Sequence, residues 1–570
     1  MAASSGRTTL SASRFGNRAR GVIVGTACGD ALGWPQEQRG GLLGGQRARD
    51  QRQPEPVFRS WTRTAGHYRS RYRDVVDAGA YSDDTQLMLA TARACLHGSH
   101  WAAQLVEVEL PTWPIYQRGG GGAVLRAAAS WARGVAPWRV PPRSNGTRSL
   151  RTYRDAGANG VAMRIAPHAI CASGPRDLTG RVIRDGVTTH GHPRALVGAL
   201  VYAHVLAYLL RTESVLGCGE ILGVAERSLV EATRAAELLP EDWGTPEQVD
   251  EFIATWSATC GEMYQLLTVV DAALRGGSAS APEDTLRELG CCDSDSNGSG
   301  TITAAGAIFV AAHFADEPLS GLVAAAFLRK ADTDTLASMA GGLLGAMHGY
   351  EWLGSLGTSV QDASYLVSVA ADLSSGPGVP VQPPDRRPSG QRRAAVDGLA
   401  SSKCGDTGVF PDGRTFRVTG INRLDEQRQR VRLCLDEGQS VMLDTPIAPE
   451  REVRLHHDSA ELCRDRSGGR LIETVLPTSD LGRCADFYGR LLGAELMVGA
   501  DTVTVVPGMA IRQSRGGLEP AGGIEITLAV PEPEAALRRV GADIVRVESG
   551  IFTVTDPDGR TLTLRADDSG

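Results

Sequence analysis

The chain has 570 residues, more than one hydrophobic core usually holds, so several domains are expected. A formal net charge of −7 and a sequence pI near 5.9 give no sign of a nucleic-acid-binding surface. Lys330 and Lys403 are the only lysines, which leaves few candidates for a Schiff-base mechanism. None of the eleven cysteines forms a CxxC pair, so reduced thiols in a cytoplasmic protein are expected rather than a disulfide framework or a zinc site.

The N-terminal part is predicted to begin with a tightly packed helix. Residues 19–33 alternate small and apolar side chains with three glycines. Glu37 follows a Trp-Pro pair, at which regular structure ends. Taken alone, it is a surface glutamate. Residues 38–78 are rich in arginine and poor in apolar side chains, and they are expected to form a long loop.

An acidic cluster precedes the next predicted helix. The run Tyr81-Ser-Asp-Asp-Thr-Gln86 places Ser82, Asp83 and Asp84 at the N-terminus of a helix with one apolar face. A helix cap accounts for one of these side chains. Two carboxylates together with a hydroxyl suit a hard divalent cation.

Two glycine-rich loops follow. Arg118-Gly-Gly-Gly-Gly122 interrupts two helical stretches, and Asp155-Ala-Gly-Ala-Asn-Gly160 leads into another. Glycines let a ligand approach the backbone closely, and free amides at a junction between loop and helix can bind phosphate oxygens. A plain flexible turn is the alternative for each loop.

A histidine-containing segment precedes the longest apolar run of the chain. His190 lies in Thr188-Thr-His-Gly-His-Pro193, and a histidine at a helix start is more often a cap or a packed residue than a catalyst. The apolar run, residues 195–210, is short for a membrane span and contains His204. We therefore predict a buried core helix.

A polar segment then imitates the start of a calcium-binding EF-hand loop. It reads Asp293-Ser-Asp-Ser-Asn-Gly-Ser-Gly-Thr301. Gly300 and Ala304 stand where an EF-hand needs an apolar residue and a bidentate glutamate. We therefore interpret the segment as a flexible polar loop.

The last acidic cluster is Leu328-Arg-Lys-Ala-Asp-Thr-Asp-Thr-Leu336. Asp332, Asp334 and Thr335 stand at the head of a helix with an apolar stripe at helical period and with glycines, as where another backbone packs closely. The arrangement repeats that of residues 82–84. If both clusters meet in one bundle, their like charges repel unless cations neutralise them, and magnesium or manganese is the natural occupant.

Taken together and in this order, the motifs resemble the ADP-ribosylglycohydrolase family. The resemblance covers roughly residues 15–370 and includes Gly25-Thr-Ala-Cys-Gly-Asp-Ala-Leu-Gly33, both acidic clusters, both glycine loops, Asn159-Gly-Val-Ala-Met-Arg-Ile-Ala-Pro167 and Thr189-His190. It implies an all-α fold around a binuclear magnesium or manganese centre that hydrolyses a bond to the distal ribose of ADP-ribose.

The resemblance also implies roles for individual residues. Glu37 is the expected catalytic residue, which would position the substrate and act in proton transfer. The expected ligands of the two metal ions are Ser82, Asp83, Asp84, Asp332, Asp334 and Thr335. The expected substrate-binding residues are Gly119, Gly120, Gly157, Asn159, Gly160 and His190. The chain departs from the family at Lys330-Ala331, where Gly-Gly is usual, and at Ser82, where threonine is commoner.

The remaining third of the chain is expected to form separate parts. After an α domain over residues 15–372, the Pro-, Arg-, Gly- and Ser-rich segment 373–405 is interpreted as a linker. Alternating apolar and polar residues predict a small β unit of unknown function over residues 406–462.

Residues 468–567 are predicted to form an α+β domain with paired β-α-β modules. Phe487-Tyr-Gly-Arg-Leu-Leu-Gly493 and Asp556-Pro-Asp-Gly-Arg-Thr-Leu-Thr-Leu564 resemble the glyoxalase/bleomycin-resistance superfamily. The positions that align with metal ligands of that superfamily are Glu473, Glu525 and Thr563. Because the threonine replaces a glutamate, we predict a binding or scaffolding module.

The sequence therefore predicts metal-dependent removal of ADP-ribosyl groups from a protein or a small molecule, in a cytoplasmic protein without a membrane span. Two alternatives stay open. In the first, the α domain is an inactive module that binds ADP-ribose. In the second, the chemistry resides in the C-terminal glyoxalase-like domain. The residues do not fix the acceptor (arginine, serine, nucleic acid or a small molecule), the choice between magnesium and manganese, or the oligomeric state.

Overall fold

The computed structural model divides the chain into two compact units, Met1–Ile447 and Ala448–Gly570. In the first unit the structure describes residues 12–37, 54–67, 70–139, 146–212, 218–231, 237–276, 281–376, 392, 396 and 398–447. In the second it describes residues 474–478, 481–492, 497–498, 502–506, 509–513, 525–530, 533–540, 545–548, 551–555 and 561–566.

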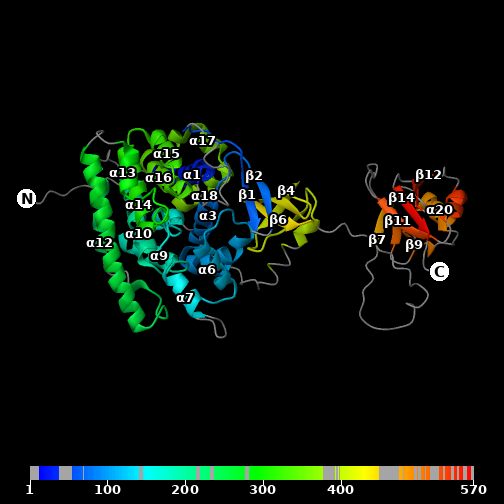
Figure 1. Ribbon diagram of the computed structural model, residues 1–570, viewed down its shortest axis with the longest axis horizontal. Coiled ribbons are helices and arrows are strands. Elements are labelled where there is room, and N and C mark those ends of the chain that lie inside the picture. Colours follow the sequence, from blue (N-terminus) through cyan, green and yellow to red (C-terminus); the bar gives the residue numbers. More distant parts are fainter. Residues whose placement is uncertain are drawn as a thin grey trace, which may run out of the picture. The chain divides into compact units, whose positions relative to one another are not determined.

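The first unit is mostly helical, as the sequence predicts (Figure 1). Its helices are α1 (Ala12–Gly33), α3 (Asp83–Leu96), α4 (Trp101–Gln104), α5 (Leu110–Thr112), α6 (Gly122–Ala132), α7 (Gly146–Arg154), α8 (Ala166–Cys171), α9 (Pro175–Gly186), α10 (Pro193–Arg211), α11 (Cys218–Glu231), α12 (Pro246–Gly276), α13 (Pro282–Glu288), α14 (Gly300–His313), α15 (Pro318–Ala326), α16 (Thr333–His348), α17 (Gly354–Ser359) and α18 (Ala363–Ser375). Its strands are β1 (Trp61–His67), β2 (Ser70–Val76), β3 (Thr407–Val409), β4 (Thr415–Arg423), β5 (Arg428–Leu435) and β6 (Ser440–Pro446).

Helices α1 and α16 pack backbone against backbone. A Cβ atom on Gly25 would lie 2.4 Å from the Gly341 carbonyl oxygen, and one on Gly341 would lie 2.2 Å from the Gly25 carbonyl oxygen. At the end of the same contact, a Cβ on Gly33 would lie 2.9 Å from the Cα of Asp334. The glycines therefore bring the C-terminus of α1 onto the N-terminus of α16.

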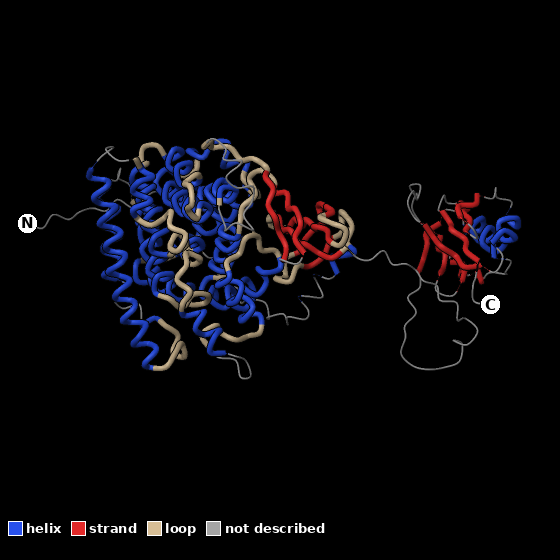
Figure 2. The backbone as a smooth tube through the Cα atoms, in the orientation of Figure 1, coloured by secondary structure: helices blue, strands red, loops and turns tan. Residues whose placement is uncertain are grey.

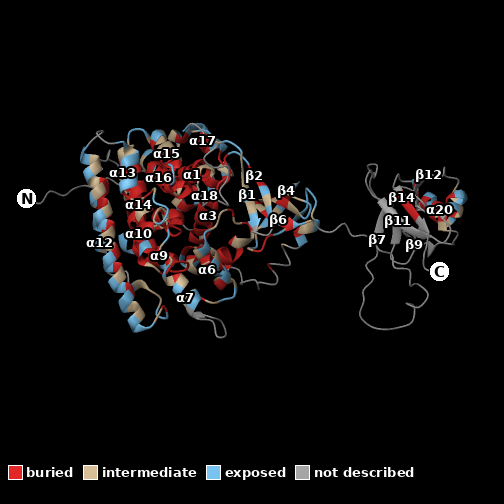
Figure 3. Ribbon diagram, viewed as in Figure 1, coloured by how far each residue is buried: buried red, intermediate tan, exposed pale blue. Residues whose placement is uncertain are grey.

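Helix α10 lies in the core, and the prediction of a buried core helix is confirmed. It is long and apolar enough to cross a membrane, but 83% of its apolar window is buried inside the fold (Figure 3). His204, the polar residue of this run, pairs through Nε2 with the Thr179 hydroxyl at 2.9 Å. Buried polar groups need such partners, so this histidine is accounted for by packing.

An arginine-rich hairpin stands where the sequence analysis expects a loop. Strands β1 and β2 pair antiparallel, with Trp61 opposite Val76, so the loop prediction is wrong for residues 61–67 and 70–76. The strand pattern is hidden because only one face of β2, with Asp74 and Val76, is buried. The opposite face is exposed and carries arginines.

The small β unit belongs to the same compact body as the helices. Strands β3 to β6 form one antiparallel sheet in chain order beside the helices (Figure 2). Its side chains Phe410 and Val431 share a buried cluster with Leu87 and Trp113. The sequence predicts a linker between the two parts, and no periodic pattern in the chain indicates that they share a core. Parts of the expected linker and β unit, residues 377–391 and 448–462, lie outside the described residues.

The second unit repeats one module: a strand, a helix and three strands. The first module contains β7 (Thr474–Thr478), α20 (Leu481–Leu492), β8 (Met497–Val498), β9 (Thr502–Val506) and β10 (Met509–Gln513). The second contains β11 (Glu525–Val530), α21 (Pro533–Val540), β12 (Val545–Glu548), β13 (Ile551–Thr555) and β14 (Thr561–Ala566). Each sheet has its first strand parallel to its fourth, in the orders β7-β10-β9-β8 and β11-β14-β13-β12.

The glyoxalase-like assignment of this unit stays a prediction. Glu525 begins β11 and Thr563 lies in β14, on neighbouring strands, where Glu525 pairs with Thr561. Glu473, the other position aligned with a metal ligand, lies outside the described residues.

Candidate metal centre

The N-terminus of helix α3 is capped by residues other than its two aspartates. Ser82 is the N-cap, and its hydroxyl accepts a hydrogen bond from the Asp84 amide at 3.3 Å. The carboxylate of Asp30, on α1, accepts from the amides of Ser82 and Thr85 at 3.0 Å and from the Thr85 hydroxyl at 2.6 Å. These bonds satisfy the backbone amides of Ser82, Asp84 and Thr85 at the start of the helix. Capping therefore does not explain Asp83 and Asp84, which are 3% and 2% exposed.

Asp332 occupies the N-cap position of α16 but makes no side-chain capping bond. Its carboxylate instead accepts from the Asn159 side-chain amide at 3.0 Å. One oxygen of Asp334 accepts from the Thr335 amide at 2.9 Å. The helix-cap interpretation therefore does not account for Asp332.

Three of the predicted site residues converge from two elements. Carboxylate oxygens of Glu37, Asp332 and Asp334 all lie within 4.8 Å of one another. Glu37 directly follows the short 3-10 helix that extends α1, and the glycine contact between α1 and α16 carries it to the two aspartates. Two segments far apart in the sequence thus form one acidic site.

The carboxylates at this site raise one another's pKa values. Burial raises the pKa of Asp84 well above its usual value, and the charges of Asp334, Asp30, Asp83 and Asp332 raise it further. Burial also raises the pKa of Asp30 to about 6, although hydrogen bonds from Thr85 and Ser82 oppose the rise. The Ser338 hydroxyl donates to Asp84 at 3.0 Å. Carboxylates at this spacing need protons or cations to neutralise them.

The donor set fits a hard divalent cation. The described acidic group of Glu37, Asp332 and Asp334 offers carboxylate oxygens and contains no histidine or cysteine. The predicted ligands Ser82 and Thr335 would add hydroxyl oxygens. Magnesium and manganese take such oxygens, whereas zinc and copper sites use nitrogen and sulfur ligands. The residues present therefore fit the metal ions that the sequence implies.

The first glycine loop touches the acidic site at Asp83. Gly119 has φ +101°, and a Cβ atom there would lie 2.8 Å from a carboxylate oxygen of Asp83. Glycine is therefore required at this position by backbone conformation and by space. The Gly120 amide donates to the Gln117 side chain at 2.9 Å, so it is engaged within the loop.

The second glycine loop is fastened on two sides. The Asn159 amide donates to the Gly298 carbonyl at 2.9 Å, and a Cβ on Gly157 would lie 3.1 Å from a His192 ring nitrogen. A Cβ on Gly160 would lie 2.9 Å from the ring of His190. His190 is 1% exposed, and burial lowers its pKa to about 3, so it is a neutral side chain packed against the loop.

The polar segment 293–301 lies beside the site. A Cβ on Gly298 would lie 3.6 Å from a carboxylate oxygen of Asp332, and the Asn297 side-chain amide donates to the Lys330 carbonyl at 2.9 Å. Lys330 has φ +68°, the left-handed conformation that favours glycine. The Gly-Gly that is usual in the family at Lys330-Ala331 is therefore the signal for a left-handed turn before Asp332, and this chain keeps the turn with a lysine.

Arg118 links the first glycine loop to the β unit. The sequence does not predict this contact. Its guanidinium donates to the buried carboxylate of Asp74, on β2, at 3.1 Å. Asp74 also pairs with Arg63 at 2.7 Å and with Arg430 of β5. No sequence pattern joins these residues, because Arg118 lies 44 positions and Arg430 lies 356 positions from Asp74.

The helical part of the chain matches a known protein family. The family model described as ADP-ribosylglycohydrolase matches residues 11–376. A solved structure named as an ADP-ribosylglycohydrolase-related protein complex is 22% identical, covers 64% of this chain and 99% of its own, and gives a TM-score of 0.40. No curated protein matches the chain.

Proposed function

Since the chain belongs to the ADP-ribosylglycohydrolase family, we propose that its first unit hydrolyses the glycosidic bond between ADP-ribose and an acceptor, with two magnesium or manganese ions. The observation that carries the proposal is the convergence of Glu37, Asp332 and Asp334 within 4.8 Å. Beside them, burial and the charges of Asp334 and Asp332 raise the pKa of Asp84. A glycoside hydrolase needs such a site, because charge develops on the sugar and on the leaving group.

The ions would be held by side chains from the starts of two helices. The proposed ligands are Ser82, Asp83, Asp84, Asp332, Asp334 and Thr335. When bound, the ions would polarise the ribose and lower the pKa of a ligated water. The two helix starts are fixed before binding: Asp30 holds the first turn of α3, and the glycine contact with α1 holds α16. The site is therefore largely preorganised, which limits the cost of ordering it on binding.

The remaining proposed residues would bind and orient the substrate. Glu37 is partly exposed, so its carboxylate can meet a ribose hydroxyl or accept a proton from an attacking water. Gly119 lies against Asp83, and Asn159 contacts Asp332, so the two glycine loops reach the acidic site at different aspartates. A diphosphate between these loops would place the attached ribose at the carboxylates. His190 would support the second loop from behind, since it is buried.

A panel of substrates tests the proposal. ADP-ribosyl-arginine, an ADP-ribosyl-serine peptide, an ADP-ribosylated nucleic acid and a small ADP-ribosyl ester are incubated with the full chain, and free ADP-ribose is measured. We expect release from at least one substrate, loss of release in EDTA, and recovery with magnesium or manganese. Binding of ADP-ribose without release from any substrate would instead show an inactive binding module. Release that persists in EDTA would contradict the metal-dependent mechanism.

A further inference from the structure

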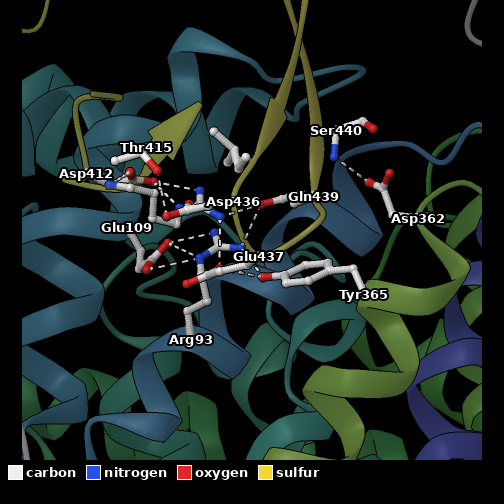
Figure 4. Close-up of polar contacts among 12 residues, drawn as sticks. Arg93, Glu109, Asp362, Tyr365, Asp412, Thr415, Asp436, Glu437, Gln439 and Ser440 are labelled. Atoms are coloured by element: carbon white, nitrogen blue, oxygen red, sulfur yellow. Dashed lines mark hydrogen bonds and ion pairs between the residues drawn. The ribbon is translucent and has the colours of Figure 1, made fainter. Parts of the chain in front are cut away.

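The turn between β5 and β6 inserts a buried glutamine into the helical body. Gln439 is 1% exposed, although side chains of hairpin turns usually face solvent. Its side-chain oxygen accepts from Arg93 at 3.0 Å and from Arg414 at 2.8 Å (Figure 4). Arg93 lies in the last turn of α3 and also pairs with Glu109 at 2.7 Å. The β unit thus holds the C-terminal end of the helix whose other end carries three of the proposed ligands.

The same turn also holds the N-terminal end of α3. Tyr81, which directly precedes Ser82, donates from its hydroxyl to Asp362 at 2.7 Å. The same oxygen of Asp362 accepts from the Ser440 amide at 2.9 Å, and Figure 4 shows this contact beside Gln439. Both ends of α3 are therefore tied to residues 439–440.

Asp362 keeps a strained conformation in this arrangement. It has φ +58° and stands at the N-cap of α18, where an aspartate usually caps the helix, yet its side chain makes no capping bond. Its carboxylate bridges Tyr81 and Ser440 instead. Left-handed backbone at a residue other than glycine is retained where the surroundings impose it. The bridge between α3 and the turn supplies that constraint.

We propose that Gln439 is a positioning residue of the metal centre and that the β unit is part of the catalytic machinery; this inference rests on the proposed function. Asp83 and Asp84 are buried among other carboxylates, so any repulsion that neither cations nor protons neutralise acts to push the first turn of α3 away from α16. Metal affinity requires ligands held near their bound geometry by the residues behind them. Gln439 accepts from Arg93 at the C-terminal end of α3, and its neighbour Ser440 is tied through Asp362 to Tyr81 at the N-terminal end. The turn is therefore placed to hold the helix there.

A pair of matched variants tests the proposal in the full chain. Gln439→Met keeps the length of the side chain and removes its hydrogen bonds. Gln429→Met makes the same change on β5, where the Gln429 amide donates to the Ala400 carbonyl inside the β unit. Two quantities are measured: amide hydrogen exchange of residues 82–85 in the metal-free protein, and the Kd for manganese by calorimetry.

We expect Gln439→Met to speed the exchange of the Ser82 and Thr85 amides about tenfold and to raise the manganese Kd about tenfold, with Gln429→Met at wild-type values. A lower melting temperature of Gln439→Met with unchanged exchange and unchanged manganese affinity would overturn the proposal, because Gln439 would then only fasten the β unit.

A second variant keeps the test decisive if Gln439→Met does not fold. Tyr81→Phe removes only the hydroxyl that donates to Asp362, and the same local gain in exchange is expected from it. Wild-type protein that binds no manganese would contradict the proposed function. The exchange of residues 82–85 would still show whether Gln439 positions α3, since that measurement needs no metal.

Discussion

The side-chain amide of Asn159 donates to a carboxylate oxygen of Asp332 across 3.0 Å. This bond joins the second glycine loop to the acidic site, and Asn159 also donates to the Thr303 hydroxyl at 3.2 Å. A loop proposed to bind the substrate and an aspartate proposed to bind a metal ion therefore share one side chain. A change at Asn159 is expected to act on both.

Replacing Asn159 with aspartate places a further carboxylate against Asp332. Because Asn159 is 6% exposed, the added charge has little water to solvate it, and we expect the metal-free protein to lose about 1–3 kcal/mol at neutral pH. Thermal melts in EDTA measure the loss. Asn422→Asp, on the exposed part of β4, is the matched control and should melt as the wild type does. Equal melting temperatures for Asn159→Asp and the wild type would contradict the placement of Asn159 against Asp332.

Gly119 and Gly121 give a second matched pair. Gly119→Ala forces a Cβ within 2.8 Å of an Asp83 oxygen at a positive φ, whereas a Cβ on Gly121 meets nothing within 4 Å. We expect Gly119→Ala to weaken manganese binding about tenfold or more, and Gly121→Ala to change it by less than about twofold. Titration calorimetry compares the two proteins. Equal affinities would remove the first glycine loop from the site.

Metal-free stability should fall as the pH rises. The raised pKa of Asp84 means that the native state keeps a proton that the unfolded chain releases above about pH 4, so the unfolded state binds fewer protons. His190 and His204, whose pKa values are lowered by burial, act in the opposite direction but only below about pH 6.5. The histidines are unchanged in Asp84→Asn, so the contribution of Asp84 is the difference between the melting temperatures of the two proteins in EDTA, and it should fall as the pH rises above about 4. Asp84→Asn should show a shallower decrease, and an equal slope in the two proteins would refute the assignment.

Lys330 and Lys403 differ in backbone conformation. Replacing each with glycine should therefore change the free energy of unfolding in opposite directions. Lys330 has φ +68°, so Lys330→Gly relieves left-handed strain and should stabilise the protein by about 0.5–1 kcal/mol. Lys403 is not among the described residues with positive φ, so Lys403→Gly should destabilise by about 0.5–1 kcal/mol through backbone entropy. Urea denaturation of both variants measures the difference. Destabilisation by Lys330→Gly would show that its side chain makes a favourable contact.

The parts of the site that could be predicted from the sequence are those with a local pattern. Oxygen donors at the heads of two helices are visible as Ser82-Asp-Asp and as Asp332-Thr-Asp-Thr, and the glycines of α16 do mark a close backbone contact. The glycine loop at 119 is also visible, because a run of glycines is rare outside turns and ligand contacts.

The parts that could not be predicted are held by single long-range contacts. Asp30 lies within a recognisable motif, but nothing local shows that it caps a helix more than 50 residues later. Gln439 lies in an ordinary hairpin turn and reaches Arg93 across 346 positions. Such pairs have no period or spacing to reveal them. The polar segment 293–301 is another example. Nothing in its sequence indicates that Asn297 contacts Lys330 or that Gly298 lies beside Asp332.

The central claim is that Asp334 is a metal ligand in a hydrolytic site, and manganese titration of Asp334→Asn tests it most directly. Asparagine can still accept the hydrogen bond from the Thr335 amide, so the start of the helix should be preserved while one charge is lost. Asp372→Asn, which removes a charge from an exposed position on α18, is the control. The account predicts a manganese Kd raised about tenfold or more, about 1.4 kcal/mol or more, a matching loss of ADP-ribose release, and a metal-free melting temperature that holds or rises. Wild-type manganese affinity and wild-type turnover in Asp334→Asn would contradict it.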